Sequence, residues 1–263
     1  MFHAEVNGAR LHYQFDGPSS APVIVLSNSL GTNLRMWDAQ IPALTEKFRV
    51  LRYDSRGHGD STVTPGPYTF EMLGNDVIGL LDALHVDRFF FCGLSMGGVL
   101  AQWLGINAPG RLNGLIACNT AAKIGNPEFW NKRIETVRSG GMAAIAGTQA
   151  LRWFTPAYVA KFPEVIETMT QGLLSTPADG YIATCEALRE NDLRESVSKI
   201  RIRTLVIVGS YDGVTPPADG KFIAAQIPRS QYVELNAAHL SNIEDSAAFS
   251  STVLQFLSYK ESR

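Results

Sequence analysis

The amino-acid sequence predicts an α/β fold: a mostly parallel, doubly wound sheet with an inserted helical cap. Short apolar runs alternate with helical patterns along most of the chain, and this alternation lapses over residues 121–192. The composition, with 45% hydrophobic and 18% charged residues, is that of an ordinary globular protein. Strands that alternate with helices are typical of parallel sheets with right-handed crossovers. We therefore expect a core domain of residues 1–120 and 193–263 and a helical cap of residues 121–192.

Length and charge exclude several classes of protein. A chain of 263 residues is long enough to bury a large core without disulfides or structural metals. Its 23 basic and 25 acidic residues give a net charge of −2, so it has no basic footprint for nucleic acid. No apolar run approaches the ~18 residues of a membrane span, and residues 1–10 lack the apolar block of a secretory signal. Three cysteines do not suit a disulfide framework, so we expect a reducing, cytoplasmic location.

The strands are predicted from two kinds of pattern. Asn7-Gly8 separates two alternating segments, residues 2–6 and 9–15, and this dipeptide favours a hairpin with a type I′ turn. Continuous apolar runs bounded by turn or charged residues are typical of strands that are buried on both faces of a parallel sheet. Six such runs follow the hairpin, at residues 23–26, 50–53, 89–92, 115–118, 205–208 and 232–235.

Helices are predicted between and after these strands. Residues 70–85 carry apolar side chains at helical spacing, and the helix expected over 96–108 has a proline just beyond its end. A third core helix is expected over 245–257. The cap should consist mostly of helices with glycine and proline between them, over residues 128–138, 142–154, 163–174 and 177–190.

A serine lies where the strand of residues 89–92 runs into the helix of residues 96–108. Residues 93–97 have the sequence Gly-Leu-Ser-Met-Gly, which is the pattern G-x-S-x-G. The small residues on either side permit a sharp turn that lifts the hydroxyl of Ser95 above the sheet. The N-terminus of the following helix offers unpaired N–H groups to an anion. Ser95 is therefore the candidate nucleophile.

A serine nucleophile needs a general base, which is most often histidine. His239 follows the last predicted strand, at the edge of the sheet where open α/β folds bind ligands. The other four histidines lie in the hairpin, in a glycine-containing loop or at a helix end. We therefore predict that His239 is the base.

The acid that orients this histidine should follow another strand. Asp212 comes four residues after the run at 205–208, whereas Asp219 and Asp192 do not directly follow a strand. The chain order Ser95, Asp212, His239 is also the order expected for a Ser-Asp-His triad on an α/β sheet. The sequence therefore predicts this triad.

Negative charge that develops on a substrate oxygen needs preorganised donors. One donor should be the backbone N–H of Met96, directly after the nucleophile. The second should come from the loop after an early strand, residues 27–32, where we assign the backbone N–H of Leu30. The side chains of Asn28 and Ser29 are expected to hold this loop.

With these residues in place, the sequence resembles the α/β-hydrolase superfamily from about residue 10 to its C-terminus. Residues 54–61 have the superfamily's D-x-R-G-x-G-x-S pattern, whose Asp, Arg and His we interpret as a structural loop. A closer resemblance, to 3-oxoadipate enol-lactonases, rests on four motifs: SNSLGT at 27–32, CNTAAKIG at 118–125, RWFT at 152–155 and AHLSNIE at 238–244. Most relatives in the superfamily have His-Gly where this chain has Asn28-Ser29.

This resemblance implies an activity. The enol-lactonases hydrolyse 3-oxoadipate enol-lactone to 3-oxoadipate in bacterial catabolism of protocatechuate and catechol, the β-ketoadipate pathway, and need no metal or organic cofactor. The expected partner is therefore a small anionic lactone. A small anion in a mostly apolar pocket needs a cation or several donors. In the cap, Arg133 and Trp130 share one helix face, so Arg133 is a candidate anion partner and Trp153 a candidate pocket wall.

Other functions remain open alongside this one. The same triad would serve a general carboxylesterase, a different lactonase or a cofactor-free perhydrolase of the haloperoxidase type. A hydrolase fold that senses a ligand with little turnover is the alternative from another class. Metal ligation is not expected, because no H-x-H, H-E-x-x-H or C-x-x-C spacing occurs. Cys92, beside the turn, is expected to be a buried packing residue.

Overall fold

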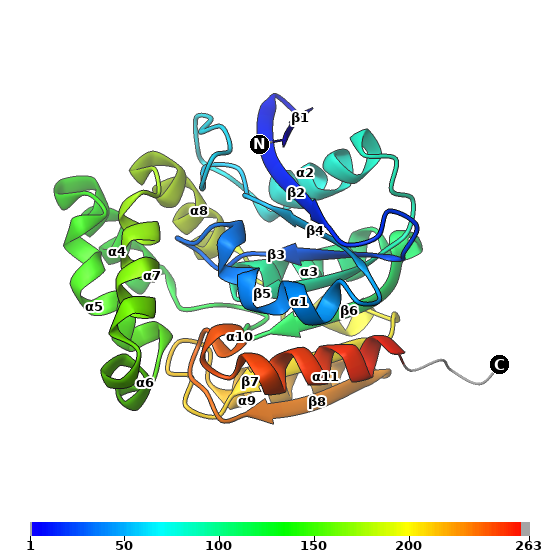
Figure 1. Cartoon of the computed structure of the whole chain (residues 1–263). Helices are drawn as coiled ribbons and strands as arrows, with labels where there is room; N and C mark the ends of the chain where they lie inside the picture. Colours follow the sequence, from blue (N-terminus) through cyan, green and yellow to red (C-terminus); the bar gives the residue numbers. More distant parts are fainter. Residues whose placement is uncertain (1, 259–263) are drawn as a thin grey trace.

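The computed structural model describes residues 2–258 and contains an eight-stranded sheet (Figure 1). The strand order is β1-β2-β4-β3-β5-β6-β7-β8. The first strands pair antiparallel, β1 with β2 and β2 with β4, and every other pair is parallel. This confirms the predicted sheet. The strands are β1 (Phe2–Val6), β2 (Ala9–Asp16), β3 (Val23–Ser27), β4 (Arg49–Tyr53), β5 (Phe89–Leu94), β6 (Leu112–Cys118), β7 (Thr204–Gly209) and β8 (Ser230–Leu235).

The predicted hairpin turn is present between β1 and β2. Val6 pairs with Ala9, and the two residues between them both have positive φ, 48° at Asn7 and 76° at Gly8. Two consecutive positive φ values define the type I′ turn, whose twist matches that of the flanking strands.

Helices cover both faces of the sheet. On one face α2 (Phe70–Ala83) and α3 (Met96–Asn107) pack together, and α9 (Pro217–Gln226) packs on β7 and β8. On the other face lie α1 (Ile41–Leu44) and α11 (Ser246–Ser258), with α10 (Ser241–Glu244) beside α11 (Figure 1). Three 3-10 helices complete the core: η1 (Leu34–Gln40), η2 (Pro109–Arg111) and η3 (Val197–Lys199).

The central strands are buried on both faces, which explains their continuous apolar sequences. Phe91 and Cys92 of β5 are fully buried, and so are Ile24 and Val25 of β3, although neighbours in each strand point to opposite faces. Over residues 2–258, no helix combines the length and apolarity needed to cross a membrane.

An inserted helical segment lies between β6 and β7, as predicted. It consists of α4 (Pro127–Gly140), α5 (Ala143–Trp153), α6 (Pro156–Lys161), α7 (Pro163–Leu174) and α8 (Ala178–Glu190). These helices stand together at one end of the sheet (Figure 1). On α4, Trp130, Ile134 and Val137 are buried along one stripe because they follow helical spacing. The short α6 and the core helix α9 were not predicted from the sequence.

Candidate active site

Ser95 lies at the sharp turn between β5 and α3. Its backbone has φ 59° and ψ −112°, a conformation that is rare for a residue with a side chain and typical of functional turns. The turn is tight because its glycines contact backbone: a Cβ on Gly93 would lie 1.9 Å from the Gly97 carbonyl oxygen, and one on Gly97 would lie 2.3 Å from the Ser27 carbonyl oxygen. The G-x-S-x-G spacing thus supplies the glycines that the turn requires.

The structure brings the three predicted triad residues together. Nε2 of His239 lies 2.9 Å from Oγ of Ser95, and Nδ1 of the same ring lies 2.8 Å from Oδ2 of Asp212. All three residues are buried, with 6% or less of each exposed. An ionised carboxylate only accepts hydrogen bonds, so Asp212 holds the ring proton on Nδ1. Nε2 is then left to accept the proton of the Ser95 hydroxyl.

Asp212 is held as a carboxylate by its neighbours. Burial alone would raise its pKa, but the charge and hydrogen bond of His239, with bonds from Thr215 and Asn119, lower it to about 2. The backbone N–H groups of Val214 and Thr215 donate to Oδ1 at 2.8 and 3.0 Å. The Thr215 hydroxyl and the Asn119 amide donate to Oδ2 at 2.9 and 3.1 Å. The carboxylate therefore stays charged throughout the neutral range.

Asn119 and Thr215 were not predicted as site residues. Asn119 follows β6, with a φ of 43°, and its amide bonds the Ala238 carbonyl as well as Asp212. Thr215 follows Asp212 by three residues and therefore reaches the same carboxylate through both its N–H and its hydroxyl. A signal for Asn119 exists: it is a polar residue directly after a central parallel strand, where ligand-binding residues gather in this class of sheet.

Two backbone N–H groups near Ser95, those of Met96 and Leu30, are candidate donors to an oxyanion. Met96 is the first residue of α3, and Leu30 lies in the loop after β3. Across the described part of the chain, neither N–H donates a hydrogen bond to another residue. Leu30 and Ser95 line the same cavity. Free N–H groups at the start of a helix and in a neighbouring loop can donate hydrogen bonds to an oxyanion.

The loop that carries Leu30 is fixed at its start. Asn28 donates through its side chain to the Tyr53 carbonyl at 2.8 Å and accepts from Trp37 Nε1 at 3.0 Å. Its own carbonyl accepts from the Gly97 N–H at 3.1 Å. Asn28 therefore ties this loop to the turn that carries Ser95, which is the holding role expected from the sequence.

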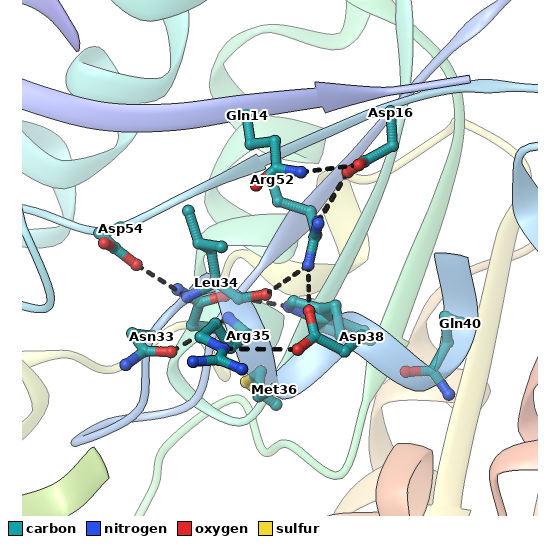
Figure 2. A network of polar contacts seen from close by, with 12 residues as sticks. Gln14, Asp16, Asn33, Leu34, Arg35, Met36, Asp38, Gln40, Arg52 and Asp54 are labelled. Atoms are coloured by element: carbon teal, nitrogen blue, oxygen red, sulfur yellow. Dashed lines mark hydrogen bonds and ion pairs between the residues drawn. The ribbon is translucent and has the colours of Figure 1, made fainter. Parts of the chain in front are cut away.

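The chain directly after this loop is fixed by charged side chains around the buried Arg52 (Figure 2). Arg52 of β4 pairs with Asp16 and Asp38 at 2.8 and 2.5 Å and donates to the Leu34 carbonyl at 3.4 Å. Asp54 accepts the Leu34 N–H at 2.7 Å. These bonds hold both polar groups of the Leu34 backbone, so the start of η1, which directly follows the loop, is tied to β4 and Asp54.

One cluster of possible metal ligands lies near this loop. Ligand atoms of His12, Asp54 and Asp60 are within 4.8 Å of one another. Asp54 already accepts from His12 Nδ1 at 2.8 Å and from the Asp60 N–H at 3.0 Å, in addition to the Leu34 N–H. Both carboxylate oxygens of Asp54 are thus engaged in holding the loop.

Residues of the inserted helical segment line an inner cavity together with Ser95. Beside Ser95, Leu30 and His239, its walls are made mostly of aromatic, aliphatic and basic side chains: Ile124, Phe129, Trp130, Arg133, Arg152, Trp153, Tyr181, Leu188 and Val214, with Ser29 and Gln149. Trp130, Arg133 and Trp153, the substrate-binding candidates of the sequence analysis, all line this cavity. The Trp130 N–H is already used, because it donates to the Ile124 carbonyl at 2.7 Å.

Arg133 faces this cavity from α4. Its Nε donates to the Tyr181 hydroxyl at 2.9 Å and one terminal nitrogen bonds Gln149. Both partners are neutral acceptors, and Arg133 forms no ion pair with any residue between 2 and 258. Its charge is thus available to an anion that enters the cavity.

Comparison with known proteins places the chain in a family. The α/β hydrolase fold family matches residues 22–246. The chain is 46% identical over 243 residues to 3-oxoadipate enol-lactonase 2 of Acinetobacter baylyi, which covers 92% of this chain and 91% of that protein. The crystal structure of the enol-lactonase from Burkholderia xenovorans LB400 superimposes with a TM-score of 0.97 at 46% identity, over 98% of this chain and 100% of that one.

A more distant structure extends this comparison. A thermophilic esterase from Thermogutta terrifontis, solved with malate bound, has a TM-score of 0.91 at 31% identity and covers 98% of each chain. The family match spans most of the chain and the relatives match it almost end to end. The chain belongs to the α/β hydrolase fold family.

Proposed function

We propose that this protein is a serine hydrolase that opens 3-oxoadipate enol-lactone to 3-oxoadipate. The observation that carries the proposal is the continuous hydrogen-bond chain from Ser95 through His239 to Asp212, beside two free backbone donors. Its substrate is supported by relatives named as 3-oxoadipate enol-lactonases, at 46% and 43% identity over 92% of this chain.

The reaction begins with attack of Ser95 Oγ on the lactone carbonyl carbon while His239 Nε2 takes the hydroxyl proton. Asp212 stabilises the imidazolium that results. The N–H groups of Leu30 and Met96 hold the oxyanion. Collapse of the tetrahedral intermediate breaks the bond between the carbonyl carbon and the ring oxygen.

The second half of the reaction releases the product. His239 protonates the enol oxygen that leaves, and the free enol tautomerises to the ketone. His239 then takes a proton from water, the resulting hydroxide attacks the acyl carbon, and the ester bond to Ser95 breaks. Ser95 recovers its proton from the imidazolium, and the new carboxylate is the second one of the product.

The substrate carries a carboxylate away from its reacting carbonyl. We assign Arg133 to this group because the guanidinium lines the cavity of Ser95 and has only neutral partners. Trp130 and Trp153 form apolar wall beside it. We also propose that residues 121–192 act as a cap over the core of residues 1–120 and 193–263, because three helices of this segment, α4, α5 and α8, line one side of the cavity.

A cytoplasmic location fits the thiols of the chain. Cys92, Cys118 and Cys185 are all buried and free, and burial raises the pKa of Cys118 and Cys185. A reducing compartment suits such thiols.

The deciding experiment follows the loss of ultraviolet absorbance of the enol-lactone, generated in situ, with purified protein and with Ser95→Ala. We expect rapid loss with the wild type and a rate reduced on the order of 10⁴–10⁶-fold in the variant. Residual activity above a tenth of the wild-type rate would refute Ser95 as nucleophile. Activity on a neutral p-nitrophenyl ester with none on the enol-lactone would retain the triad and favour a general carboxylesterase.

A further inference from the structure

A second arginine lines the inner cavity and has no anionic partner among residues 2–258. Arg152, on α5, lies in the same wall as Arg133. Its guanidinium lies 5.2 Å from the centre of the Phe129 ring. In the described range 2–258 it forms neither an ion pair nor a hydrogen bond. Two guanidiniums therefore share one small cavity without a carboxylate between them.

This arrangement is costly in the empty protein. Burial lowers the pKa of Arg152, and the positive charge of Arg133 lowers it further. The opposing contributions come from Tyr181 and Asp212, but Asp212 already serves His239. A half-buried cation without a partner gains from any anion that reaches it.

Arg152 also lies at a boundary. It lines the inner cavity and a larger outer cavity of about 840 Å³, which Tyr158, Lys161 and Tyr211 also line. Val214 is the other residue that lines both cavities. A ligand in the inner cavity can therefore reach Ser95, Arg133 and Arg152 together, with Arg152 also open to the outer cavity.

The charge of the ligand changes during the proposed reaction. The lactone carries one carboxylate, whereas the tetrahedral intermediate and the hydrolysed product each carry two negative charges. A single arginine matches the substrate, whereas the second carboxylate of the product can be matched by a second cation. The number of unpaired arginines in the cavity equals the number of charges on the product.

We propose that Arg152 is a second anion-binding residue, which with Arg133 makes the cavity selective for ligands with two negative charges. The inference rests on the proposed function for its substrate, but its prediction concerns binding and needs no turnover. The expected ligand class is a linear dicarboxylate of about the length of the product.

The test measures binding of adipate and of adipate monomethyl ester by calorimetry at pH 7.5. These ligands have the same chain and differ by one charge. We expect the wild type to bind adipate about tenfold or more tightly than the monoester, the range of a charge-assisted hydrogen bond. In Arg152→Gln the ratio of the two dissociation constants, monoester to adipate, should fall to near one. Binding of the monoester should change little.

Two further variants complete the design. Arg152→Lys keeps the charge without the planar fork and should recover most of the preference for adipate. Arg138→Gln, which removes an exposed arginine of α4, should behave as the wild type. An unchanged ratio in Arg152→Gln, or a wild type that does not prefer adipate, would overturn the inference.

Failure of the inference and failure of the proposed function are distinguishable. Suppose that the protein hydrolyses the enol-lactone and that Arg152→Gln still prefers adipate to the monoester as the wild type does. The proposed function then stands and the second anion site is refuted. A protein that shows the charge preference without hydrolysing the lactone retains the site and loses the reaction.

Discussion

The side-chain amide of Asn119 donates to Oδ2 of Asp212 at 3.1 Å, although the two residues are 93 positions apart in sequence. The same amide donates to the Ala238 carbonyl at 3.1 Å. One side chain after β6 thus contacts both the acid after β7 and the residue that precedes His239. Asn119 therefore links the acid to the loop of the base.

Replacing Asn119 with alanine should slow the reaction without weakening substrate binding. The variant removes one hydrogen bond to a charged group and leaves the Ala238 carbonyl without this donor. We expect kcat to fall about 10- to 100-fold, the equivalent of ~1.5–3 kcal/mol, with KM nearly unchanged. Steady-state kinetics on the enol-lactone checks this, with Asn107→Ala on the exposed surface of α3 as control. An equal loss in both variants would contradict the role of Asn119.

Replacing Arg133 with glutamine should raise KM for the charged lactone far more than for a neutral ester. The variant keeps a polar group near Tyr181 and Gln149 and removes the charge. Loss of a charge-assisted contact predicts an increase in KM of about tenfold or more. Parallel kinetics on the two substrates checks this, with Arg138→Gln as control. Equal changes on both substrates would exclude Arg133 as the carboxylate partner.

Glycine at position 93 should be indispensable for the fold of the turn. A Cβ at this position meets backbone atoms of Gly97 at 1.9 and 2.2 Å, so Gly93→Ala must displace the turn that carries Ser95. We expect a loss of more than about 3 kcal/mol in the free energy of unfolding. Gly147→Ala is the matched control, because the helical Gly147 of α5 has open space around it and should gain about 0.5–1 kcal/mol. Urea unfolding of both variants checks the contrast, and a fully stable Gly93→Ala would refute it.

His58 should make the fold sensitive to mild acid. Burial lowers its pKa from 6.5 to about 4, and the hydrogen bond to the Arg56 carbonyl offsets this only in part. Its Nε2 is buried without a partner. Between pH 6.5 and 4 the unfolded chain binds a proton here that the folded protein does not, so stability falls as the pH falls through this window. Above pH 6.5 the residue is neutral in both states and contributes no pH dependence.

The contribution of His58 can be isolated by comparing urea unfolding at pH 7.5 and pH 5. Between pH 7.5 and pH 5 the residue should lower the free energy of unfolding of the wild type by about 2 kcal/mol. The decrease for His58→Gln should be smaller by this amount. His85→Asn is the control, since His85 is exposed and its positive φ of 55° suits asparagine. An equal decrease in the free energy of unfolding in all three proteins would show that His58 does not titrate in this window.

Most of the sheet was predictable because its strands are buried on both faces. Continuous apolar sequence locates such a strand, but its ends are set by hydrogen bonds to neighbours. For this reason β6 begins at Leu112, three residues before the run that predicted it. Helix α9 was missed because it buries little: only Gly220 and Ile223 of its ten residues are buried, and an amphipathic stripe is absent from its sequence.

The site was predictable where function follows the topology. Ser95, Asp212 and His239 each come after a strand, and the carboxyl ends of parallel strands meet at one edge of a sheet. No comparable rule locates the substrate-binding residues of the inserted helices. Several arginines lie on these helices, and spacing placed Arg133 beside Trp130 but did not distinguish Arg152 from a solvated surface residue. That distinction requires knowledge of which cations lack a partner in three dimensions.

The inner cavity is small, and this constrains how a substrate reaches Ser95. Its volume is about 40 Å³, against about 840 Å³ for the outer cavity. A lactone with a carboxylate arm is larger, so we expect the inserted helices to shift when such a substrate enters. The Trp153 carbonyl at the end of α5 accepts the N–H of Leu240 at 2.9 Å, one residue after His239. A movement of α5 that admits substrate therefore also pulls on the loop of the base, which couples entry of the substrate to alignment of the histidine.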